Sequence, residues 1–134
     1  MMPKRFAERA MRDSYFQQGM MVLKSDSYYR MVVDRLMGFI SRIDGLYDTG
    51  RLGEAVSLAK IALKYVDAQT EAASKHLAPL LREQKEHPHP SLESEILSSP
   101  HYSAVQIFPV WEEYYSAVSS DIKSIISPSN NSMN

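Results

Sequence analysis

Apolar residues recur every three or four positions along two stretches of the chain that meet at Gly50. The apolar positions before and after the glycine are Tyr29, Val32, Val33, Leu36, Ile40, Ile43 and Tyr47, then Leu52, Val56, Ala59, Leu63, Val66, Ala73, Leu77 and Leu80. This spacing places each set on one face of a helix. The short connection predicts antiparallel helices, with Gly50 at a positive φ angle as the cap of the first.

Two further helices are predicted on either side of this hairpin. The first covers residues 4–23, where Pro3 suits the first turn and Gly19 is expected to bend the helix or end it early. The last covers residues 109–126, with apolar positions again in helical step. The sequence therefore predicts an all-α fold: a small helical bundle of four main helices with a central antiparallel helical hairpin.

Prolines break the pattern between the hairpin and the last helix. Pro79 is expected to kink or restart the helix that contains it. Residues 87–102 contain three prolines and are predicted to form a proline-containing linker or long loop, with only a short helix at 92–97. We expect residues 1–126 to form a single helical domain and the polar residues 127–134 to form a disordered tail.

Gly38 and Gly45 lie inside the predicted second helix, where glycine is costly. Each lowers helix stability by up to about 1 kcal/mol relative to alanine. The simplest interpretation is close packing against a neighbouring helix, at points where a Cβ atom would not fit.

The composition of the chain excludes several kinds of chemistry but does not identify a function. The 134 residues carry a net charge of −1 and no cysteine, which excludes disulfides, zinc–thiolate sites and thiol nucleophiles. The basic N-terminus is not followed by an apolar stretch of signal-peptide length, and no apolar run is long enough to cross a bilayer. We expect a cytoplasmic protein with no membrane partner.

No catalytic signature is present in the sequence. There is no nucleophile elbow and no glycine-rich phosphate loop. His87 and His89 form an H-x-H pair that could ligate zinc, with His76 and His101 elsewhere in the chain, but the pair flanks prolines in a predicted loop. We therefore expect no enzymatic activity, no catalytic residues, no cofactor, no metal and no small-molecule substrate.

Basic residues on the predicted second helix raise the possibility of a nucleic-acid partner. Arg35 and Arg42 are seven positions apart and so share a helix face, and Arg30 lies on the same predicted helix. Such arginines contact phosphates in helical nucleic-acid readers. Because Asp34 and Asp44 lie among them, we expect most of these arginines to form surface ion pairs, and nucleic acid is not the favoured partner.

Residues 50–63 keep the order of the second helix of a tetratricopeptide-type helix pair. The matching positions are Gly50, Ala55, Ala62 and Leu63. The stretch resembles that family, and equally resembles the microtubule-interacting-and-trafficking helical hairpin. Phe39 and Ile43 replace the large residue and the glycine that the repeat family has in its first helix, and no second copy appears at the repeat period. Both resemblances imply peptide or protein binding.

Two clusters of large apolar side chains are the candidate partner-binding residues: Tyr15, Phe16, Met20 and Met21 in the first helix, and Trp111, Tyr114 and Tyr115 in the last. They spread over more than one side of each helix, whereas one bundle core covers one stripe. We therefore expect at least one of Tyr114 and Tyr115 to be exposed or at an interface, and the partner to be another protein or a second copy of this chain. The expected function is a non-catalytic adaptor, or a chaperone-like helical module that covers an apolar segment of its partner. The alternative is a small regulator acting at nucleic acid or at a DNA-bound protein.

Overall fold

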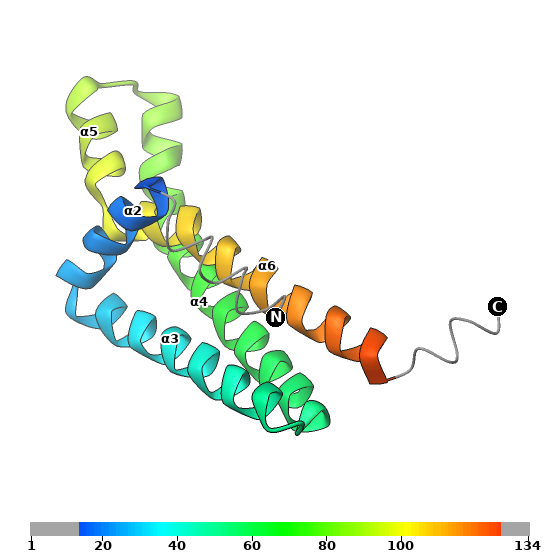
Figure 1. Ribbon diagram of the computed structural model, residues 1–134. Helices are drawn as coiled ribbons and strands as arrows, with labels where there is room; N and C mark the ends of the chain where they lie inside the picture. Colours follow the sequence, from blue (N-terminus) through cyan, green and yellow to red (C-terminus); the bar gives the residue numbers. More distant parts are fainter. Residues whose placement is uncertain (1–13, 127–134) are drawn as a thin grey trace.

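The computed structural model describes residues 14–126, except for the side chains of Tyr15 and Ile126. Across these residues the chain forms five helices and no strand, which confirms the predicted all-α class (Figure 1). The helices are α2 (Ser14–Ser25), α3 (Ser27–Asp48), α4 (Leu52–Glu86), α5 (Pro90–Ser98) and α6 (Pro100–Ile126). The predicted start of the first helix and the predicted disordered tail lie outside the described residues.

Local signals set the two ends of α3. Asp26 is the N-cap, and its carboxylate accepts hydrogen bonds from the backbone N–H groups of Tyr28 and Tyr29, both at 3.0 Å. After Thr49 the chain turns at Gly50, whose φ of 77° confirms the predicted left-handed cap conformation. A side chain would be strained at this φ, so glycine is the residue that lets the chain turn at this point, and α4 comes back alongside α3 (Figure 1).

The most extensive helix contact is between α4 and α6, and α6 also packs against α2 and α3. Tyr115 is fully buried, and its hydroxyl donates to the backbone carbonyl of Leu36 at 2.8 Å. Tyr114 is 2% exposed, and its hydroxyl reaches the Asp44 carboxylate at 3.4 Å. The prediction that one of these two tyrosines is exposed is therefore wrong, because neighbouring helices cover α6 on more than one side.

The predicted linker at residues 87–102 is mostly helical in the structure. Pro90 begins α5 and Pro100 begins α6, positions where the missing N–H of proline has no helical partner to lose. Pro79 and Pro109 lie inside α4 and α6, and both are exposed. Both helices continue past these prolines.

Gly19 lies inside α2, where the helix passes very close to α6. A Cβ atom added at Gly19 would lie 2.5 Å from two side-chain atoms of Ile107. One turn earlier, the ring of Phe16 packs against Trp111 with centroids 5.1 Å apart. Gly19 therefore permits a close helix crossing, and α2 continues through it to Ser25 rather than ending early.

Candidate partner-binding groove

The structure buries most of the side chains that the sequence nominates for partner binding. The exposed fractions are 4% for Phe16, 3% for Met20, 2% for Trp111, 2% for Tyr114 and 0% for Tyr115. The expectation that these five present a surface is wrong, because α2 and α6 cover one another and α6 also contacts α3 and α4. Met21 is exposed at 73%, and the side chain of Tyr15 lies outside the described part of the chain.

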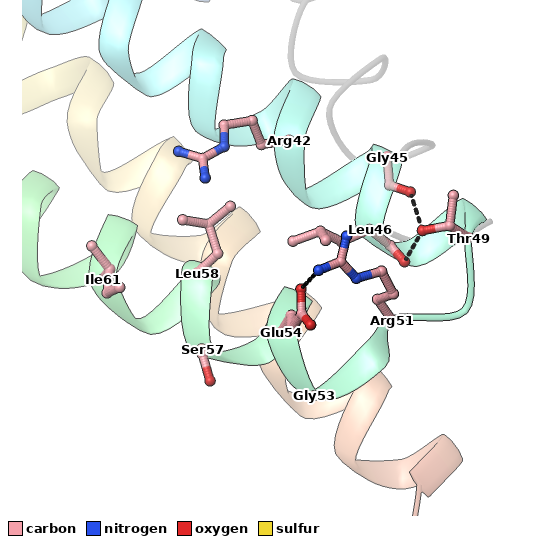
Figure 2. Close-up of a pocket in the computed structure, with 10 residues that line it drawn as sticks. All are labelled: Arg42, Gly45, Leu46, Thr49, Arg51, Gly53, Glu54, Ser57, Leu58 and Ile61. Atoms are coloured by element: carbon pink, nitrogen blue, oxygen red, sulfur yellow. Dashed lines mark hydrogen bonds and ion pairs between the residues drawn. The ribbon is translucent and has the colours of Figure 1, made fainter.

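A more open surface lies between α3 and α4, beside the Gly50 turn. It consists of two adjoining hollows that share Arg42, and we call them together the α3–α4 groove. The larger has a volume of about 660 Å³ and lies next to the turn (Figure 2), and the smaller has a volume of about 370 Å³. Along α3 the groove runs from Arg35 to Thr49, about 21 Å at the helical rise of 1.5 Å per residue.

Apolar side chains from both helices form part of the groove lining. Leu46 comes from α3, and Leu58 and Ile61 come from α4. Ile61 is 57% exposed, which makes it one of the most exposed large apolar residues among those described. Figure 2 shows Arg42 extending from α3 toward Leu58, so a cation borders this apolar lining.

Three helical glycines line the groove, and none of them is needed for packing within the described chain. They are Gly38, Gly45 and Gly53. A Cβ atom added at any of the three would meet nothing within 4 Å, in contrast to Gly19. The interpretation of Gly38 and Gly45 as points of close internal packing is therefore wrong. Their absent side chains leave the backbone of α3 accessible from the groove.

The groove also carries arginine side chains. Among the described residues, ion pairs join Arg51 to Glu54 and Lys75 to Glu71. Within residues 14–126, Arg35 and Arg42 make no ion pair with another side chain. These two positive charges lie on one face of α3.

Tyr65 lies at the far end of the groove, beneath Arg35. The guanidinium carbon of Arg35 is 5.8 Å from the centre of the Tyr65 ring. The Tyr65 hydroxyl oxygen is buried, and the Arg35 guanidinium is a polar neighbour of it. Burial raises the pKa of this hydroxyl, and the Arg35 cation opposes that effect.

A separate polar cluster links the start of α3 to the start of α6. The Tyr29 hydroxyl lies 2.6 Å from Nδ1 of His101, and the His76 ring stacks on His101 with centroids 4.7 Å apart. Beside them the Tyr28 hydroxyl donates to the Gln69 side chain at 2.6 Å. Burial, followed by the neighbouring His76, lowers the pKa of His101, and burial raises the pKa of Tyr29 to about 12. A neutral imidazole whose Nδ1 accepts a hydrogen bond from the neutral Tyr29 hydroxyl fits both shifts, so we interpret the cluster as a pH-sensitive contact between helices.

A second titrating contact joins α4 to α6. A hydrogen bond with Asp67, followed by burial, raises the pKa of the Glu112 carboxyl to about 7. Two carboxyl groups held together share a proton more readily than they ionise together. The stability of the α4–α6 contact should therefore depend on the protonation of the Glu112–Asp67 pair.

The H-x-H pair has a structural role at the start of α5. His89 is the N-cap of that helix, and its Nδ1 accepts a hydrogen bond from the backbone N–H of Ser91 at 3.2 Å. Across residues 14–126 no group of three or more histidine, aspartate or glutamate side chains is arranged to hold a metal ion. In the same part of the chain no helix is both long enough and apolar enough to pass through a bilayer.

Comparison of the chain with protein-family models, with curated proteins and with solved structures finds no match. The sequence alone had marked Gly38, Gly45, Arg35 and Arg42 as unusual residues of one helix. It did not show that Ile61 of α4 lines the same hollow as Arg42 and Gly45, and that arrangement is what makes the α3–α4 groove a candidate site.

Proposed function

We propose that this chain is a single-domain, non-catalytic protein-binding module, an adaptor or chaperone-like protein that covers an apolar segment of a partner in the α3–α4 groove. The observation that supports this most is the exposed apolar side chain of Ile61 in a groove bordered by arginines. Ordinary surfaces carry single exposed apolar residues, but here the exposure coincides with a hollow and with glycines that have no internal contact.

The resemblance of residues 50–63 to tetratricopeptide-type helix pairs supports the same proposal. That stretch supplies the α4 side of the larger hollow, including Ser57, Leu58 and Ile61. What the resemblance implies, peptide or protein binding without a reaction, agrees with a shallow groove of mixed apolar and cationic character.

A regulator acting at nucleic acid is the second candidate, and Arg35 and Arg42 favour it because neither has an acidic partner among the described residues. Phosphate contacts would make any binding fall steeply with salt concentration. The apolar lining at Leu46, Leu58 and Ile61 favours a protein instead, since a phosphate backbone gains nothing from it. Titration of a duplex oligonucleotide at low and moderate salt separates the two.

The experiment that tests the proposal compares two charge insertions at exposed apolar residues. Ile61→Glu places a charge in the groove, and Met21→Glu places one on α2, outside it. Tagged wild-type and variant proteins are used to capture partners from the native host. The captured protein is then purified, and its direct binding to each variant is measured by calorimetry.

We expect Ile61→Glu to abolish direct binding and Met21→Glu to leave it unchanged, with both variants melting near the wild-type temperature. Both side chains are largely exposed, so neither charge is buried in the free protein. Full retention of binding by Ile61→Glu would contradict the proposed groove. Loss of binding with Met21→Glu alone would move the partner site to α2.

A further inference from the structure

On the basis of the proposed function, we infer that the occupant of the α3–α4 groove is one α-helix of a partner protein, with small residues on its docking face and acidic side chains along its edge. The two features that carry the inference are the pair of glycines on α3 and the pair of arginines beside them. Each feature restricts the occupant in a different way.

Gly38 and Gly45 specify close approach of a rod-like partner. They are seven residues apart, so they lie on one face of α3 about 10 Å from each other. Helices that cross at residues without side chains can bring their backbones close together, provided that the facing residues are also small. A partner helix with alanine, glycine or serine at positions seven apart would match both glycines at once.

The walls of the groove favour a helix over an extended peptide. Peptides that bind by β-strand addition need an exposed sheet edge for their backbone hydrogen bonds. Here both walls are helices, α3 and α4, whose interior backbone groups are already bonded within each helix. A helical partner satisfies its own backbone groups and needs only side-chain contacts, and the 21 Å length of the groove accommodates about 14 residues of helix.

Charge selects an acidic helix and disfavours a second copy of this chain. Arg35 and Arg42 repeat the seven-residue spacing of the glycines, so carboxylates at the same spacing on the partner can pair with both. In a symmetric dimer through this groove, each arginine would face the same arginine-bearing surface of its mate. That arrangement sets like charges against each other, and the groove's acidic residue Glu54 is already paired with Arg51.

The test uses two synthetic helical peptides of about 18 residues, slightly longer than the groove. Both carry the same alanine and leucine face, but one is flanked by glutamates and the other by lysines. Binding of each labelled peptide to the full chain is followed by fluorescence anisotropy. We expect the glutamate peptide to bind at least roughly tenfold more tightly than the lysine peptide, with a preference that shrinks as salt rises.

Charge reversal at the groove supplies the matched experiment. The double variant Arg35→Glu, Arg42→Glu is expected to reverse the preference, so that the lysine peptide binds more tightly. Equal binding of the two peptides to the wild-type chain, or binding of neither, would overturn the inference. So would an unchanged preference in the double variant.

The glycines are tested separately with the glutamate peptide. Gly45→Ala is expected to weaken binding at least roughly tenfold, because its Cβ occupies space that the partner backbone needs. Ser41→Ala is the control, since Ser41 is an exposed α3 residue that does not line either hollow. Unchanged binding by Gly45→Ala would show that no close backbone approach occurs there.

These outcomes are distinguishable from failure of the proposed function. If Ile61→Glu abolishes binding of the natural partner but the peptides show no charge preference, the groove is a protein-binding site with a different occupant. If Ile61→Glu leaves natural-partner binding intact, the proposed function itself is wrong.

Discussion

The same substitution, glycine to alanine, should change stability in opposite directions at different helical glycines of this chain. At Gly38 and Gly45 an added Cβ meets nothing within 4 Å, and neither residue has a positive φ angle. Alanine then supplies only its higher helix propensity, about 0.5–1 kcal/mol at each site. Because the two positions are about 10 Å apart, the effects should add, so the double variant should gain about 1–2 kcal/mol.

At Gly19 the same propensity gain is opposed by a steric clash. The new Cβ would lie 2.5 Å from both Cδ1 and Cγ1 of Ile107, a buried side chain that is 2% exposed and would have to shift. Overpacking of this kind costs about 1–3 kcal/mol. Gly19→Ala should therefore lower the free energy of unfolding, by up to about 2 kcal/mol after the propensity gain is subtracted.

Urea unfolding followed by circular dichroism measures both the expected gain and the expected loss of stability. The midpoint should rise for Gly38→Ala and Gly45→Ala and fall for Gly19→Ala, with unchanged slopes throughout. A lowered midpoint at Gly38 or Gly45 would mean that these glycines have an internal role, and would remove the support that they give to the partner groove. A raised midpoint at Gly19 would refute the assignment of a tight α2–α6 crossing.

Three further predictions concern hydrogen bonds and protons in the α3, α4 and α6 contacts. Tyr115→Phe removes the buried hydrogen bond to the Leu36 carbonyl but leaves little empty space. Thermal unfolding should therefore show a loss of about 1 kcal/mol in the free energy of unfolding. An unchanged stability would refute a stabilising role for this hydrogen bond. The lowered pKa of His101 means that the unfolded chain binds its proton more readily, so stability should fall as the pH drops below 6.5. His101→Gln should flatten that part of the pH–stability profile, and an identical profile would contradict the interpretation. The raised pKa of Glu112 acts in the opposite direction, and stability should fall as the pH rises from 4.5 to about 7. Glu112→Gln should abolish that fall in stability. At pH 8 the variant should be more stable than the wild type by less than about 1 kcal/mol, since the carboxyl pair is partly solvated. A variant that is less stable at pH 8 would refute repulsion between the ionised Glu112 and Asp67 carboxylates.

The helical class follows from the sequence because apolar spacing is a local signal. The turn at Gly50 is equally local, since a glycine between two periodic stretches suits the left-handed cap that the structure contains. The prolines between His87 and Tyr102 do not determine the local structure by themselves. A proline is compatible with either a loop or the first turn of a helix, and only the flanking structure shows that Pro90 and Pro100 begin α5 and α6.

The candidate site was less predictable than the helices because it depends on what each helix face meets. The sequence predicts that Tyr114 and Tyr115 cannot both be buried, because one core covers only one face of a helix. In the structure both are buried, because α2, α3 and α4 together cover more than one face of α6. The number of neighbours around a helix is a property of the assembled bundle. Apolar surplus on one isolated helix therefore says little about exposure.

The helical glycines also cannot be interpreted without knowing what each one faces in the structure. In the sequence, Gly19 and Gly45 are both single glycines inside helical patterns, with the same expected cost to helix stability. In the structure one of them faces Ile107 at clashing distance and the other faces an open groove. A costly residue with no internal contact is more informative about a partner than a large apolar residue, because the fold tends to bury the apolar residue for its own stability. In this chain that reasoning moves the candidate interface from α2 and α6 to the groove between α3 and α4.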